Sequence, residues 1–161
     1  VNSYVDTATA KEMGLSMIND KNADILWGVA GLSGNGAAEA ALESGKAWFI
    51  GVDSDQELTL PADQAAITLT SGLKNVGKSI IWLFDEWDAG RTYWGKEVRL
   101  GISEGGVGIV IDKNFAKVAP KAVQDAVLAA QADIVAGKIV VPTAIGDTTN
   151  AVVTLRDSLQ P

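Results

Sequence analysis

The first third of the chain alternates apolar runs with helical segments. The runs ADILWGVAG (residues 23–31) and KAWFIGV (46–52) are almost continuously apolar, which is typical of strands buried on both faces of a parallel sheet. Between them, the alanine-rich segment AAEAALES (37–44) predicts a short helix that Gly45 ends as its C-cap. These residues therefore predict a strand, a helix and a second strand in close succession.

A helix is also predicted before the first apolar run. Apolar residues recur at helical spacing between residues 7 and 22, and Asp6, Thr7 or Thr9 can cap the start of this helix. Residues 1–5 are interpreted as the end of a preceding strand. Strands and helices thus alternate with short connections, an order that predicts an α/β fold with a parallel sheet and right-handed crossovers.

The rest of the chain extends this alternation. Further strands are predicted at QAAITLT (64–70), at EVRLGIS (97–103) and GVGIVI (106–111) around a turn, and at KIVVP (138–142). Two longer helices are predicted, from Ser71 to Gly90 and from Pro120 to Gly137. The tail from residue 143 to 161 carries only a weak strand signal at AVVTL (151–155).

Three strand exits are polar or rich in glycine. They are DTAT (6–9), GLSGNG (31–36) and DSDQ (53–56). Ligands of open parallel sheets bind beyond the carboxyl ends of the strands, so these three exits are expected to meet along one edge. This convergence predicts a binding site there.

Asp53 and Asp55 at the third exit allow several interpretations. They could act as a catalytic acid and base, ligate a hard cation or shape a turn. A carboxylate at a strand end could also accept hydrogen bonds from paired hydroxyl groups of a sugar, with Lys74 completing the clamp. The residues alone leave these alternatives open.

The glycine-rich loop does not match a dinucleotide fingerprint. Gly34 and Gly36 could form the first glycine pair, but Glu39 stands where that fingerprint requires a small residue. The loop can still offer backbone N–H groups to a polar ligand, or it can serve only as a tight turn.

Composition narrows the function classes. The 161 residues favour one domain, and a net charge of −7 disfavours nucleic acid as a partner. Cysteine and histidine are absent, which excludes thiolate or histidine metal sites and nucleophilic Cys or Ser–His chemistry within this chain, and neither a metal nor a cofactor is predicted. Of the five tryptophans, Trp27 and Trp48 lie within predicted strands and are expected in the core.

Several segments, in this order and spacing, resemble one protein family. They are ADILWGVAGLSGNGAAEAALESG (23–45), GVDSDQ (51–56), LTSGLKNVGKSI (69–80), LGISEGGVGI (100–109) and VQDAVLAAQADIVAGKIVVP (123–142). The family is the basic membrane protein family of ABC-transporter substrate-binding lipoproteins, many of which resemble purine-nucleoside receptors. The resemblance covers about residues 1–142.

The resemblance implies a Rossmann-like lobe of a type I periplasmic-binding-protein fold. Residues 1–161 would form a single unit, the second lobe with a hinge-crossing helix, and the N-terminal lobe would be absent. The implied function is capture of a small polar ligand, most simply a nucleoside, in a cleft between two lobes, with no enzymatic activity. A ligand-sensing regulatory domain of the same fold is the alternative.

The resemblance also assigns the site residues. Asp53 would accept hydrogen bonds from ribose hydroxyls with help from Lys74, and Asp55 would lie nearby and order the loop. Gly31 and the loop after it, with Asn35, would line the base or sugar edge. Tyr4 would replace a stacking phenylalanine of the family.

Partners and location follow from the same resemblance. The full-length protein would deliver its ligand to an ABC permease from outside the cytoplasm, held by lipid on an N-terminal cysteine that precedes this sequence. An uncovered apolar face from Ile80 to Trp87 would favour self-association of the isolated chain.

Overall fold

The sheet has four strands in the order β1-β2-β3-β4, and the computed structural model describes residues 3–142 and 149–158. The strands are β1 (Ile25–Trp27), β2 (Trp48–Asp53), β3 (Thr68–Lys74) and β4 (Val107–Ile109). The first three are parallel, and β4 runs antiparallel to β3. The predicted α/β class is confirmed, with a sheet that is parallel except for β4.

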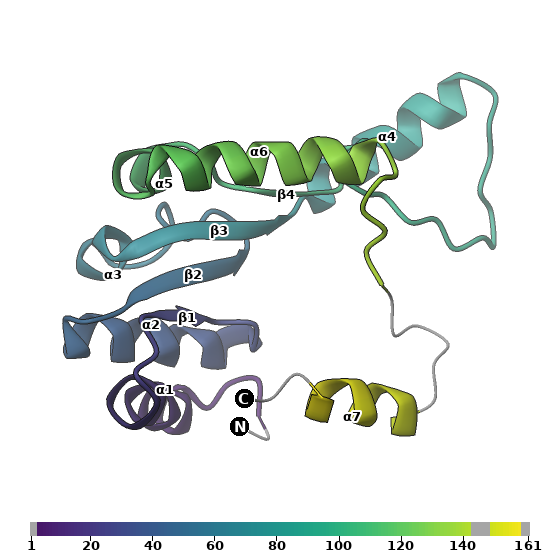
Figure 1. The fold of residues 1–161 in the computed structure, drawn as a ribbon. Helices are drawn as coiled ribbons and strands as arrows, with labels where there is room; N and C mark the ends of the chain where they lie inside the picture. The colour runs from purple at the N-terminus through teal and green to yellow at the C-terminus, as the bar shows by residue number, and fades with distance from the viewer. Residues whose placement is uncertain (1–2, 143–148, 159–161) are drawn as a thin grey trace.

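Two helices cover one face of this sheet (Figure 1). They are α1 (Thr7–Lys21), which Asp6 caps through a bond from the Thr9 N–H to its side chain, and α2 (Gly34–Ser44), which ends at Gly45 in the left-handed region. Both follow the sequence prediction, although α2 begins three residues early. The core between helices and sheet is made of Ile18, Leu26, Ala38, Ala40, Ala41, Ala47 and Phe49.

Small residues bring α1 and α2 close together. A Cβ atom added to Gly14 would lie 2.8 Å from the Cβ atom of Ala40, and one added to Gly36 would lie 2.1 Å from the Thr7 carbonyl oxygen. The two helices can approach this closely only because glycine and alanine occupy the crossing. The alanine-rich composition of α2 therefore has a packing reason as well as a helix-forming one.

The other face of the sheet is open at β1. Leu26 is buried, but its neighbours Ile25 and Trp27 are 43% and 63% exposed, and Trp48 in β2 is half-buried. The prediction that these strands are buried on both faces, with Trp27 in the core, is wrong. The pleat turns alternate side chains to opposite faces, and within the described residues α1 and α2 cover only one of them.

Four predicted strands are not formed as expected. Residues 3–5, 97–103 and 138–142 form no strand, and residues 151–155 lie in α7 (Thr149–Ser158), while residues 1–2 of the first lie outside the described residues. The apolar segments at 97–103 and 138–142 find no neighbouring strand within the described residues. Strand propensity forms a strand only where a partner supplies the hydrogen bonds.

The remaining helices also differ in part from prediction. Ser71 lies inside β3, and the next helix, α4 (Val76–Asp88), begins after Asn75. Two short helices, α3 (Ala62–Ala66) and α5 (Lys113–Val118), were not expected. The helix predicted after Pro120 is α6 (Lys121–Val135), and Gly137 follows it in the left-handed region.

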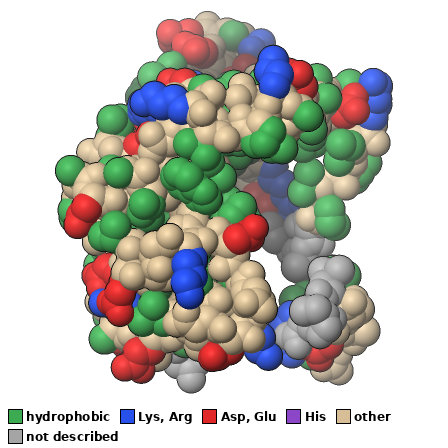
Figure 2. Space-filling view, turned by 60° about the vertical axis from the view of Figure 1, so that its left-hand side comes forward, with side chains coloured by type: hydrophobic (Ala, Val, Ile, Leu, Met, Phe, Trp, Pro, Cys, Tyr) green, Lys and Arg blue, Asp and Glu red, His purple; other side chains and the backbone are tan. Residues whose placement is uncertain are grey.

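α4 extends away from the sheet and exposes its apolar residues (Figure 1). None of its residues is buried, and Ile81, Phe84 and Trp87 are 61%, 55% and 55% exposed. Figure 2 shows hydrophobic side chains at the surface in several groups. The predicted apolar face from Ile80 to Trp87 is therefore present and uncovered in this chain. Among the described helices, none has the length and apolar character needed to cross a bilayer.

Candidate functional site

Asp53 and Lys74 meet at the carboxyl edge of the parallel strands. Each is the last residue of its strand, and β2 and β3 are neighbours whose register pairs Asp53 with Leu73. Lys74 Nζ lies 2.9 Å from Asp53 Oδ1, and the two side chains are 63% and 55% exposed. Because both side chains are more than half exposed, a ligand can reach them. An ion pair this exposed contributes little to stability.

The backbone of Asp53 is unusual. Its φ is +68°, in the left-handed region that only a few per cent of residues other than glycine adopt, aspartate among the more frequent. This conformation ends β2 abruptly. An unfavoured backbone at an exposed strand end is typical of a residue placed for function.

Tyr4 and Gly31 lie together, so the segment before α1 and the glycine-rich loop are joined. The Ser33 N–H donates to the Tyr4 carbonyl oxygen at 3.0 Å, and Ser33 Oγ donates to the Ser3 carbonyl oxygen at 2.8 Å. Gly31 has φ +58°, and a Cβ atom there would lie 3.3 Å from the Tyr4 carbonyl oxygen. The Tyr4 side chain is largely exposed and available for stacking on a flat ligand.

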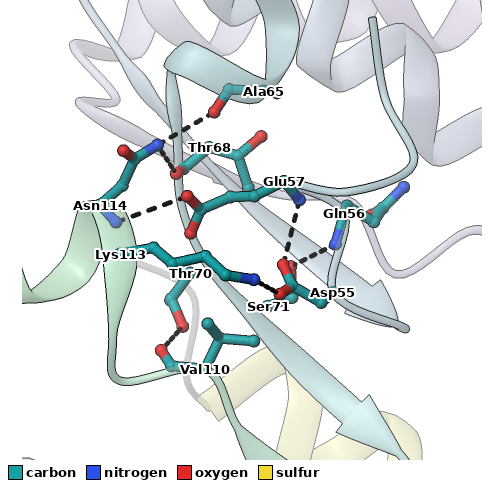
Figure 3. A network of polar contacts seen from close by, with 10 residues as sticks. All are labelled: Asp55, Gln56, Glu57, Ala65, Thr68, Thr70, Ser71, Val110, Lys113 and Asn114. Carbon is teal, nitrogen blue, oxygen red and sulfur yellow. Dashed lines mark hydrogen bonds and ion pairs between the residues drawn. The ribbon is translucent and has the colours of Figure 1, made fainter. Parts of the chain in front are cut away.

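Asn35 is joined to the exit of β2 by Gln56, a residue that the sequence analysis did not single out. Gln56 Nε2 donates to Asn35 Oδ1 at 3.3 Å, and Gln56 Oε1 accepts the Val52 N–H at 2.9 Å. The Gln56 N–H donates to Ser71 Oγ at 3.0 Å (Figure 3). Its position as the last residue of the GVDSDQ segment was the signal available in the sequence.

Asp55 orders the loop rather than joining the Asp53–Lys74 pair. Its Oδ1 accepts the Glu57 N–H at 3.2 Å, and its Oδ2 forms an ion pair with Lys113 (Figure 3). This ion pair raises the pKa of Lys113 above its ordinary value. The two aspartates thus engage different lysines, which offers no support for a shared acid–base pair.

A second polar group fastens α5 to α3 and to the start of β3. Asn114 Nδ2 donates to the carbonyl oxygens of Ala65 and Thr68 at 3.0 and 2.9 Å, and its N–H donates to Glu57 Oε2 (Figure 3). Burial raises the pKa of Glu57, whose Oε1 is buried with no hydrogen-bond partner. Within residues 3–142 and 149–158, no cluster of His, Cys, Asp and Glu could hold a metal ion.

Two cavities lie away from the Asp53–Lys74 pair. One, of about 350 Å³, lies at the end of α4 and is lined by Phe84, Trp87 and Trp94 among others. The other, of about 330 Å³, lies between α1 and β1. Neither is lined by Asp53, Asn35 or Lys74, and the side chains of Asp53 and Lys74 are themselves more than half exposed.

Residues 1–144 match the family described as "ABC transporter substrate-binding protein PnrA-like". The chain is 30% identical over 153 residues to the ABC transporter nucleoside-binding protein BmpA of Lactococcus lactis, and 31% identical over 144 residues to basic membrane protein A of Borreliella afzelii. Each alignment covers 88% of this chain and 42% of the relative. The chain therefore spans less than half the length of these relatives.

A solved structure shows the same fold. An ABC-transporter solute-binding protein from Aeropyrum pernix K1 superposes with a TM-score of 0.70 at 23% identity, over 98% of this chain and 50% of that one. Substrate-binding components of ABC transporters are extracytoplasmic and bind their solute without transforming it. The matched residues, the coverage and the fold agree, and the chain belongs to the Bmp/PnrA-like family of ABC transporter substrate-binding proteins.

Proposed function

We propose that the full-length protein containing this chain captures a nucleoside and that Asp53 binds the sugar hydroxyl groups. The observation that carries this proposal is the exposed pair of Asp53 Oδ1 and Lys74 Nζ, 2.9 Å apart where β2 and β3 end. A relative with 30% identity is named as a nucleoside-binding protein.

The chemistry of the pair suits a ribose. An ionised carboxylate is only an acceptor, and its two oxygens can take hydrogen bonds from two adjacent hydroxyl groups. Hydrogen bonds to a charged group are about twice as strong as those between neutral groups. Lys74 orients one carboxylate oxygen and retains N–H groups that can donate to the same sugar.

The base would lie toward the segment that holds Tyr4 and Gly31. Tyr4 presents an exposed ring against Gly31, and aromatic rings stack on flat heterocycles. Asn35 belongs to the helix that follows this loop. The sugar and the base would thus be held by different strand exits.

The other wall of the cleft would come from the part of the protein that this chain does not span. The uncovered residues of α4, including Ile81, Phe84 and Trp87, form an apolar face that we propose packs against that part as a second lobe. Closure of the two lobes around the ligand would present it to an ABC permease. For the isolated chain, we propose that the same face drives self-association, and for the full-length protein that a lipid on an N-terminal cysteine anchors it.

Nucleoside-induced stabilisation of the full-length protein tests the proposal. Adenosine, inosine, guanosine and uridine are added singly, and the melting temperature is compared among the wild type, Asp53→Asn and Asp24→Asn. Asp24 is an exposed aspartate just before β1 and serves as the charge-matched control. The proposal expects stabilisation by at least one nucleoside, its loss in Asp53→Asn and its retention in Asp24→Asn. No stabilisation of the wild type by any of the four contradicts the proposal.

A further inference from the structure

The side-chain amides of Gln56 and Asn35 form a short series of hydrogen bonds that starts at the backbone. The backbone group determines which atom donates in each bond. The first member is the Val52 N–H, which lies 2.9 Å from the side chain of Gln56. A backbone N–H can only donate, so the Gln56 atom that faces it must be the carbonyl oxygen Oε1. The orientation of this amide is therefore fixed by chemistry and not by choice of rotamer.

The second member inherits its direction from the first. Because Gln56 Oε1 accepts from the Val52 N–H, the Gln56 group that faces Asn35 at 3.3 Å is the amide NH2 group at Nε2, which can only donate. Asn35 must therefore accept this hydrogen bond through its carbonyl oxygen Oδ1. The opposite arrangement would place two N–H groups against each other and leave both without an acceptor.

The last group in this series of hydrogen bonds, the Asn35 amide, therefore presents an N–H donor. Among the residues that the structure describes, Asn35 Nδ2 has no hydrogen-bond acceptor. It is also not among the buried polar atoms that lack a partner. Asn35 Nδ2 is therefore accessible to solvent. Asn35 is the second residue of α2 and follows the loop that contacts Tyr4. Its free donor therefore lies in the segment toward which the base is placed.

The packing around Gln56 supports a defined position for this side chain. A Cβ atom added to Gly51 would lie 2.8 Å from Gln56 Oε1 and 2.5 Å from Ser71 Oγ, so a glycine is needed beneath it. Ser71, fully buried, also accepts the Gln56 N–H at 3.0 Å. The close approach of Gly51 and the hydrogen bond from the Gln56 N–H to Ser71 thus restrict Gln56, and its side-chain amide has little freedom to rotate.

We infer that Gln56 is a positioning residue that makes Asn35 a hydrogen-bond donor to the ligand, so that the site selects a base with an acceptor at this place. This inference rests on the proposed nucleoside function and adds a polarity to it. The site would then offer an acceptor to the sugar through Asp53 and a donor to the base through Asn35. A ligand with the sugar intact but without the base acceptor would lose one hydrogen bond.

Two substitutions test whether Asn35 presents a donor or an acceptor to the ligand, while both keep a polar side chain at the position. Asn35→Asp keeps an oxygen for Gln56 Nε2 and replaces the outward N–H by an acceptor. Gln56→Glu keeps an oxygen for Val52 and presents a second oxygen to Asn35, so the Asn35 amide should rotate and turn Oδ1 toward the ligand. Asn19→Asp, on the exposed face of α1, is the matched control.

The measurement is the affinity of the full-length protein for adenosine and for 1-, 3- and 7-deazaadenosine, each of which replaces one ring nitrogen by C–H. We expect one analogue to bind the wild type and Asn19→Asp about 5- to 10-fold more weakly than adenosine, the value of one hydrogen bond. In Asn35→Asp and Gln56→Glu this ratio should fall to about one. A general loosening of the loop would lower both affinities and leave their ratio unchanged.

Two results overturn the inference while leaving the proposed function in place. They are adenosine binding with no penalty for any analogue, and a penalty that is the same in the two variants. If no nucleoside binds at all, the proposed function fails, and neutron diffraction from crystals of the full-length protein still decides the amide chain. Deuterium on the Asn35 atom that faces Gln56 contradicts the inferred direction, and deuterium on the outward atom supports it.

Discussion

Lys74 Nζ lies 2.9 Å from Asp53 Oδ1 because parallel neighbouring strands end at the same edge of the sheet. The pair is exposed, and its geometry is set by the strands rather than by the ion pair itself. Each partner can therefore be changed with little effect on stability.

Lys74→Met should weaken nucleoside binding without unfolding the protein. Removal of an exposed ion pair is expected to change the free energy of unfolding by less than about 1 kcal/mol. Loss of a charged donor to the ligand should reduce affinity by about 10-fold or more. Isothermal titration and urea unfolding of the full-length variant measure the two quantities. A variant that binds like the wild type removes Lys74 from the site.

Gly14→Ala should destabilise the protein although alanine is the better helix former. The added Cβ atom would lie 2.8 Å from the Ala40 Cβ and 3.1 Å from Leu26 Cδ1, so α1 and α2 must separate. We expect a loss of about 1–3 kcal/mol in the free energy of unfolding. Asn19→Ala, at an exposed position of α1, should be neutral or slightly stabilising. Equal stability of the two variants contradicts the close helix contact.

Glu57→Gln should stabilise the protein at neutral pH and lose this advantage in acid. Burial raises the pKa of Glu57 above its ordinary 4.5, so the folded state binds the proton more tightly than the unfolded state. The wild type therefore loses stability as pH rises from about 4.5 through the folded pKa. The variant, which does not titrate, escapes this loss.

The difference in stability between the wild type and Glu57→Gln, followed by urea unfolding across pH, measures this effect. A wild type that gains on the variant as pH rises would show that the carboxylate is favoured in the folded state.

Phe84→Ala should strongly destabilise the full-length protein, even though Phe84 is 55% exposed in this chain. If α4 packs against the second lobe, the substitution removes a buried aromatic side chain and costs about 3–5 kcal/mol. Val118→Ala, at a 43% exposed position on α5, should cost less than about 1 kcal/mol. A small effect of Phe84→Ala would mean that the α4 face stays exposed in the full-length protein.

Local signals were sufficient to predict α1, α2 and β2, although not at residues 3–5, where a strand was expected and none forms. The cap at Asp6, the left-handed Gly45 and the apolar run of β2 depend on neighbours in sequence, and the structure shows each of them. The family resemblance selected Asp53 and Lys74, which the structure brings together. Their role in binding remains a prediction.

The errors occur where structure depends on partners distant in sequence. Trp27 has the pattern of a core residue, but its side chain is 63% exposed on the open side of β1. Residues 97–103 and 138–142 have strand propensity without a strand beside them. Gln56 was missed because its role arises from Val52, Ser71 and Asn35, whose proximity to it is set by the fold.

If Asp53 recognises the hydroxyl groups of a sugar, replacing it should remove most of the preference for a nucleoside that carries them. Titration calorimetry on the full-length protein compares adenosine with 2′,3′-dideoxyadenosine, which has the same base and no ring hydroxyls. We predict that the wild type binds adenosine about 100-fold more tightly, and that Asp53→Asn reduces this ratio to about 10-fold or less. Equal affinities of the wild type for the two compounds, or an unchanged ratio in Asp53→Asn, would contradict the account.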